Sequence, residues 1–283
     1  MSFAFFFNMI PTGLILSAEL RYRQILEDFF ISVYDEKSIP SHGITHHRRV
    51  WSFAKELLNL PWYSKSASSN LVEKLLIASY LHDIGMSVEK GLRHGKHSRD
   101  FSIKFLAKNN LNPEDFSDML DAIENHDRKN YLIQSTDNLL LTILSVADDL
   151  DAFGFTGIYR YTEIYHLREI KPEFLGHRIQ ENAKVRFDNL EKTLATCSDF
   201  MKKHKSRYMI LNNFFTEYNR QAETYSFGGS NPNGYCGAIE LLVQSINNRN
   251  GILGYSRFAE KFPEDHVISS FFKELISEIS GPA

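Results

Sequence analysis

LVEKLLIASYLHDIG, residues 71–85, is a strongly apolar stretch that ends in a histidine, an aspartate and a glycine. Its apolar content predicts a buried helix from Leu71 to His82, and Gly85 stands where a helix C-terminal cap is expected. His82 and Asp83 then supply one nitrogen and one oxygen ligand for a divalent metal at the end of that helix. The carboxylate of Asp83 can also bridge to a second metal.

Two further ligand candidates lie in apolar helical patterns on either side of this stretch. His46 opens a predicted helix that ends near Pro61, and Asp148 lies near the end of the nearly continuous apolar run Leu139–Leu150. Buried carboxylates are costly unless they are paired or bound to a metal. We therefore predict that His46, His82 and Asp148 bind a metal with Asp83, although His47 is an alternative to His46. Of the neighbouring acids, Asp149 is expected to face solvent and Asp151 to accept a hydrogen bond at the helix end.

A second metal needs additional ligands, and two histidines between Asp83 and Asp148 are suitable. His94 lies in a glycine-containing polar loop, Glu89–Lys96, before a predicted helix from His97 to Lys108. His126 follows a predicted helix that Asn112 and Pro113 begin. His97 is the alternative to His94. The remaining histidines are interpreted as ordinary surface or core residues: His42, His166, His177, His204 and His266.

Basic side chains beside the predicted ligands could hold a phosphate. Lys96 lies two residues after His94, and Arg128 lies two residues after His126. Lysine and arginine are the side chains that commonly bind phosphate oxygens. We therefore assign catalytic roles to Asp83, Lys96 and Arg128.

The helical periodicity continues along the chain without an alternating, strand-like series, which predicts an all-α protein. We expect an apolar N-terminal segment at residues 1–16, a metal-binding core at residues 17–170 and a helical C-terminal extension at residues 171–283 that packs on the core. The extension is expected to contain one long helical stretch, Phe174–Tyr225, followed by a loop, Phe227–Tyr235. That loop is interpreted as a plain connection, with a substrate lid as the alternative.

Composition excludes several classes of protein. The chain has 283 residues and a formal net charge of −3, so no basic excess indicates nucleic-acid binding. Two distant cysteines form no disulfide framework, and this favours a cytoplasmic protein. Residues 1–16 contain a proline and are too short to span a membrane. We expect this segment to pack on the domain or at a homo-oligomer interface, with a membrane-surface anchor or a start at Met9 as alternatives.

Together, His46-x-x-Arg49-Val50, His82-Asp83-x-Gly85, His94-x-x-x-Ser98, His126 and Ala147-Asp148-x-Leu150-Asp151 resemble the HD superfamily of metal-dependent phosphohydrolases. The resemblance covers residues 46–151 and implies an all-α fold with the metal held between helices. It also implies that His46, His82, Asp83 and Asp148 hold the first metal, and that His94 and His126 complete a second site around Asp83. The glycine-tyrosine-proline signature of the cyclic-di-GMP subgroup is absent, as are the surroundings typical of dNTP triphosphohydrolases.

The resemblance implies hydrolysis of a small, nucleotide-like phosphate ester by a metal-activated water. The cofactor would be one or two divalent ions of iron, manganese, nickel, cobalt or zinc, because mixed imidazole and carboxylate ligands suit all of them. Two alternatives remain open. The same ligand order is similar to that of the HD-fold non-haem di-iron oxygenases, and the fold can also serve as a non-catalytic sensor or scaffold.

Overall fold

The computed structural model describes residues 9–34, 39–91, 93–128, 139–249 and 251–280, and these residues contain helices and no β-strand. The prediction of an all-α protein is therefore confirmed. The chain divides into two compact units, with the division between Leu150 and Asp151. It falls earlier than the boundary at residue 170 that we expected. None of the described helices combines the length and the apolar character that a membrane crossing requires.

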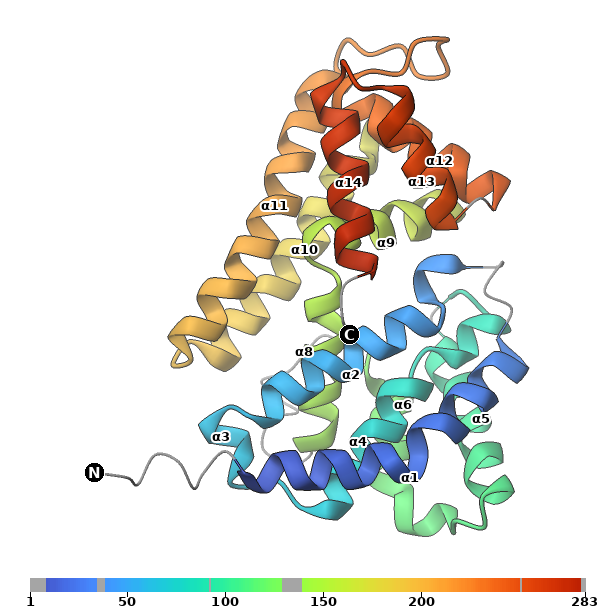
Figure 1. Ribbon diagram of the computed structural model, residues 1–283, viewed down its shortest axis with the longest axis vertical. Coiled ribbons are helices and arrows are strands. Elements are labelled where there is room, and N and C mark those ends of the chain that lie inside the picture. The colour runs from blue at the N-terminus through green and yellow to red at the C-terminus, as the bar shows by residue number, and fades with distance from the viewer. Residues whose placement is uncertain (1–8, 35–38, 92, 129–138, 250, 281–283) are drawn as a thin grey trace. The chain divides into compact units, whose positions relative to one another are not determined.

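The first unit is built around α4 (Ser69–Leu81), which is buried along most of its length. It packs against α1 (Met9–Val33), α2 (Ile44–Leu58) and α6 (Ser117–Asn125) (Figure 1). The Ser68 hydroxyl caps its N-terminus by accepting a hydrogen bond from the backbone N–H of Leu71. From Leu75 to Leu81 the helix is almost entirely apolar and buried, so neighbouring helices can cover it on all sides. His82 follows its last residue within the unit.

The first unit contains two further long helices and several short elements. They are η1 (Pro40–His42), α3 (Pro61–Ser64), η2 (Ile84–Ser87), α5 (His94–Lys108), η3 (Pro113–Phe116) and α8 (Leu139–Asp151). The Asn112 side chain caps η3, and Pro113 is its first residue, as predicted. Helix α5 begins at His94, three residues before the predicted start. Residues 1–8 of the predicted N-terminal segment lie outside the described residues, and Met9 already belongs to α1.

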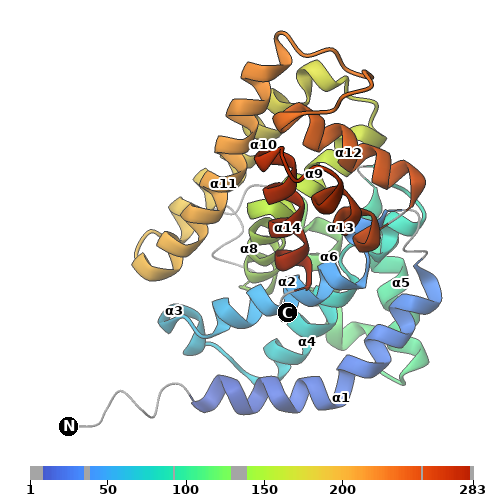
Figure 2. The same ribbon diagram turned by 45° about the horizontal axis from the view of Figure 1, so that its top comes forward.

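The second unit contains α9 (Gly154–Leu167), α10 (Pro172–Leu194), α11 (Ser198–Ala222), α12 (Gly234–Asn248), α13 (Gly251–Lys261) and α14 (His266–Ser280). Helix α9 packs against α11, α12 and α14, and this explains why it belongs to the second unit. Helices α10 and α11 lie side by side in both views (Figures 1 and 2). The packing of the C-terminal helices on the core remains a prediction, because it concerns how the two units are placed relative to each other.

The prediction of a single helical stretch from Phe174 to Tyr225 was wrong, because the chain reverses between Leu194 and Ser198. The apolar faces of α10 and α11 meet after the reversal, and the ring of Phe187 stacks on that of Tyr208 with centroids 4.3 Å apart. The apolar periodicity is the same on both sides of the turn. No glycine or proline marks the turn, so the sequence pattern gave no sign of it.

Candidate metal centre

The six predicted ligands come from five helices of the first unit, and all six side chains are buried. His46 lies in the first turn of α2, while His82 and Asp83 follow the last residue of α4. His94 begins α5, His126 follows α6, and Asp148 lies in the last turn of α8. The sequence separates these residues by up to 102 positions (148 − 46), so the fold has to bring them together.

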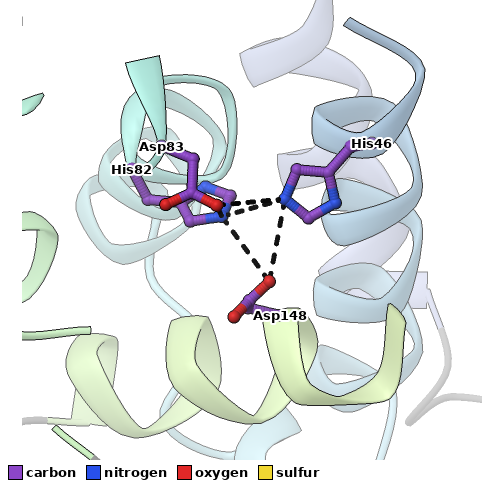
Figure 3. Close-up of side chains that lie close together, drawn as sticks. All are labelled: His46, His82, Asp83 and Asp148. Carbon is purple, nitrogen blue, oxygen red and sulfur yellow. Dashed lines mark hydrogen bonds and ion pairs between the residues drawn. The ribbon is translucent and has the colours of Figure 1, made fainter. Parts of the chain in front are cut away.

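His46, His82, Asp83 and Asp148 form the first group of side chains (Figure 3). The Nε2 atoms of His46 and His82 are 3.2 Å apart, and each lies 3.5 Å from Oδ2 of Asp83. Oδ1 of Asp148 lies 3.7 Å from Nε2 of His46 and 3.8 Å from Nε2 of His82. Four ligand atoms of the preferred types therefore surround one point.

Asp83, His94 and His126 form the second group. Oδ1 of Asp83 lies 3.0 Å from Nε2 of His126 and 3.3 Å from Nε2 of His94. The two imidazole nitrogens are 3.4 Å from each other. Asp83 thus directs Oδ2 to the first group and Oδ1 to the second, which is the arrangement that a bridging carboxylate requires.

Backbone carbonyl groups orient three of the four imidazoles. Nδ1 of His82 lies 3.1 Å from the carbonyl oxygen of Ser79. Nδ1 of His94 and Nδ1 of His126 each lie 2.7 Å from a carbonyl oxygen, those of Gly91 and Ile123. A carbonyl oxygen only accepts hydrogen bonds, so Nδ1 carries the proton and Nε2 of the neutral ring keeps its lone pair. This is the orientation found in metal-binding histidines.

Burial and the charge of Asp83 shift the pKa values of the imidazoles in opposite directions. Burial opposes the charged form of His94, but the hydrogen bond and charge of Asp83 outweigh it and raise its pKa to about 9. The pKa of His126 is raised for the same reasons, whereas burial lowers the pKa of His82. Burial also opposes the charge on Asp83, yet the surrounding histidines hold the pKa of its carboxyl well below the ordinary value.

These side chains fit a divalent metal. Several Nε2 lone pairs and three carboxylate oxygens face one another in a buried space, and such an arrangement is repulsive unless protons or a cation lie between them. Imidazole and carboxylate ligands suit iron, manganese, nickel, cobalt and zinc. The His/Asp group can therefore hold a metal ion, and its atoms do not select one metal over the others.

Close backbone contacts that glycines permit bring the second group together. A Cβ atom at Gly85 would collide with the carbonyl oxygen of His94 and would lie 2.5 Å from the backbone nitrogen of Ser98. The Gly85 N–H instead donates to Oγ of Ser98 at 2.9 Å. Gly95 allows a similar approach of α5 to the backbone of Glu124, next to His126. His94 can therefore reach Asp83 because Gly85 in η2 and Gly95 in α5 let α5 approach its neighbours closely.

The alternatives to two of the predicted ligands lie elsewhere. His97 lies 3.4 Å from a carboxylate oxygen of Glu89, outside both groups. His47 is buried and supplies no atom to either group: Nδ1 lies 3.1 Å from the carbonyl oxygen of Ser79, and its ring lies against Phe30 and 5.0 Å from the ring of His82. Lys96 and Arg128 are exposed, so their roles in binding phosphate remain predictions.

One expectation about the neighbouring residues was wrong. Asp149 does not face solvent: it is only 3% exposed, because α8 is covered on all sides. His42, expected to be an ordinary surface or core histidine, is buried in η1 close to the centre, with Nε2 4.0 Å from Oδ2 of Asp83 and Nδ1 2.8 Å from Oγ of Ser41. Asp151 forms an ion pair with Arg160 at 3.3 Å.

The comparisons with known proteins agree with this geometry. The family model described as HD domain matches residues 43–152, the span that contains all six side chains. Neither the curated proteins nor the solved structures gave a significant match to the chain. Residues 43–152 therefore match an HD domain, and this match supports the resemblance of the first unit to the HD superfamily.

Proposed function

We propose that this protein is a metal-dependent phosphohydrolase or phosphodiesterase that cleaves a small, nucleotide-like phosphate ester with a metal-activated water. The proposal rests on the placement of the Asp83 carboxylate, whose two oxygens face two separate groups of imidazoles. Such a carboxylate suits a centre of two metals, and two-metal centres catalyse in-line displacement at phosphorus.

The chemistry that bound divalent cations would supply is ionisation of a water molecule and neutralisation of charge on the phosphoryl oxygens. The protein holds the ligands before substrate arrives. His82, His94 and His126 are fixed by backbone carbonyl groups, so little reorganisation is needed. Because the residues are buried, few water molecules compete with substrate for the centre.

Three side chains beside the centre are candidates for contacting the substrate. His42 lies on the side of Asp83 that faces the first group, where its imidazole could donate a hydrogen bond to a phosphoryl or leaving oxygen. Lys96 and Arg128 lie two residues after His94 and His126. Their exposed amine and guanidinium groups could bind the more distant phosphates of a nucleotide.

The direct test is a substrate screen with the full-length protein, loaded separately with manganese, iron, cobalt, nickel and zinc. The panel contains mononucleotides, nucleoside triphosphates, cyclic nucleotides and bis-p-nitrophenyl phosphate, and the release of phosphate or nucleotide is measured. Asp83→Ala should abolish any activity. Asp100→Ala, which changes an exposed aspartate of α5, is the matched control and should leave it unchanged. Absence of product from every substrate with every metal would overturn the proposal.

The same ligands also suit the two alternative functions, and the screen separates them. Two equivalents of iron, with oxygen uptake and no phosphate release, would indicate a di-iron oxygenase. A protein that binds metal but turns over no substrate of either kind would be a sensor or scaffold.

A further inference from the structure

The second unit contains a cavity of about 620 Å³ that no part of the metal centre occupies. Its walls come from the connection between α9 and α10, from α10, α11 and α12, and from the loop that joins α11 to α12. A volume of this size is in the range of cavities that enclose small organic ligands. The described residues that line it all belong to the second unit.

The floor and walls of the cavity are apolar and aromatic. Leu175, Tyr218 and Ile239 are buried at its lining, and Phe227 and Val243 are partly buried there. The Tyr218 hydroxyl donates a hydrogen bond to the carbonyl oxygen of Pro172 at 2.9 Å, so its polar group is satisfied and its ring remains as a wall. Aromatic rings in such positions favour a flat, apolar ligand face.

The rim of the cavity carries side-chain amides. Gln244, Asn247 and Asn248 lie on the exposed side of α12, and Nε2 of His166 is 2.9 Å from Oδ1 of Asn247. An amide both donates and accepts hydrogen bonds. Such groups match the donor and acceptor edge of a nucleobase, for which asparagine and glutamine are suitable partners.

The charges of the lining argue against a phosphorylated ligand. Among the described residues that line the cavity, none is a lysine or an arginine. The carboxylate of Glu240 is engaged, because it accepts hydrogen bonds from the Tyr225 hydroxyl and from the Gly228 N–H, both at 2.6 Å. These two bonds fix the loop that carries Phe227. A phosphate group would find no cation here and would lie close to a carboxylate.

From these observations we infer that the cavity binds a neutral, planar heterocycle with a nucleobase-like edge, as in an unphosphorylated nucleoside. The ring would lie against Phe227 and Tyr218, and its polar edge would meet the amides of α12. This site goes beyond the proposed phosphohydrolase centre, since it lies in the other unit and selects against the phosphate that the centre would require.

The test is isothermal titration of the full-length protein with adenosine, guanosine, cytidine and uridine, with ribose as a control and AMP as a charged comparison. Val243→Trp fills the cavity, and Val185→Trp, at an exposed position of α10, is the matched control. Gln244→Leu removes one amide at an exposed position, where folding should not be affected. Asp83→Ala removes the metal centre and is titrated in parallel.

At least one nucleoside should bind to the wild type, Val185→Trp and Asp83→Ala proteins with equal affinity. Val243→Trp should lower that affinity by about tenfold or more, and Gln244→Leu by about fivefold, which corresponds to one neutral hydrogen bond. AMP should bind to Asp83→Ala more weakly than adenosine. The inference fails if no nucleoside binds, or if Val243→Trp and Gln244→Leu both bind as the wild type does. It also fails if only Asp83→Ala abolishes binding, because the nucleoside would then occupy the metal centre.

Discussion

His94 and His126 face each other with their Nε2 atoms 3.4 Å apart, while Nδ1 of each ring lies 2.7 Å from a backbone carbonyl oxygen. Since each carbonyl oxygen accepts the proton of Nδ1, the Nε2 atoms face each other and Oδ1 of Asp83. The carboxylate raises the pKa of both rings and so favours protons on Nε2, and a bound cation would take the place of these protons. With Asp83, the pair therefore forms a candidate metal position in addition to the candidate position between His46, His82 and Asp148.

His126→Gln should remove only the metal of the second group. We expect elemental analysis to find about two equivalents in the wild type, as two-metal centres hold, and about one in this variant. Asp148→Asn should remove the metal of the first group in the same way. If either single substitution removed all the metal, the two positions would not be independent.

Asp83→Ala should remove both metals and all activity, because Asp83 is the residue that the two groups share. The helices should remain folded, since α4 is held by apolar packing along most of its length. Circular dichroism with elemental analysis of the same sample checks both expectations. Complete unfolding would mean that the metal is structural.

The sequence pointed to His82, Asp83 and Asp148 because polar groups at the ends of strongly apolar helices are costly to bury unless a cation or a partner compensates them. His94 and His126 were assigned to a second site through the family resemblance. It could not tell which of two neighbouring histidines faces the centre. The choice between His94 and His97 depends on where α5 begins, and that start is set by the contacts of Gly85 and Gly95 with other helices. Such long-range contacts leave no local pattern.

The units of the fold were harder to predict than its helices. Helix α9 continues the helical pattern of α8 without a composition change, yet its apolar face packs on α11, α12 and α14. His42 was missed for a related reason. A histidine in a loop with Pro40 and Gly43 resembles a surface residue, and only the turn of η1 directs it toward Asp83.

His42→Gln should retain both metals and lower kcat/KM by about 100-fold. This is the lower end of the rate contribution that a general acid or base typically makes. The reason is its position, since Nε2 lies 4.0 Å from Oδ2 of Asp83 but outside both ligand groups. Elemental analysis and steady-state kinetics on the same preparation separate the two effects. A variant that lost metal would make His42 a ligand, and one with unchanged kinetics would leave it without a role in turnover.

Gly85→Ala should destabilise the protein and weaken the second metal position. The added Cβ would collide with the backbone of α5, which must move away from Asp83, and overpacking of this kind costs about 1–3 kcal/mol. Gly13→Ala is the control: its Cβ would meet nothing within 4 Å, and it lies in α1. That change should stabilise the protein by about 0.5–1 kcal/mol. Denaturant unfolding measures the change in the free energy of unfolding for each variant. Equal changes would show that the close approach of Gly85 to α5 does not contribute to stability.

The stability of the first unit should depend on the charge of Glu27 in α1. Its carboxylate accepts hydrogen bonds from Arg48 of α2 at 3.0 Å, from Tyr80 of α4 at 3.0 Å and from Arg23 at 3.2 Å. Burial opposes the charged form, but these bonds outweigh it and lower the pKa of Glu27 below 4.5. The stabilisation is therefore complete above pH 4.5 and is lost as the pH falls through the lowered pKa.

Glu27→Gln should accordingly reduce the free energy of unfolding by about 1–2 kcal/mol at pH 7, because hydrogen bonds to a charged group are replaced by weaker ones. The difference from the wild type should shrink as the pH falls below 4.5, where the wild-type carboxylate also becomes neutral. Urea unfolding at a series of pH values measures this difference, with Glu114→Gln, at an exposed residue of η3, as the control. A difference that stayed constant from pH 7 to pH 3 would mean that Glu27 acts through its shape and not through its charge.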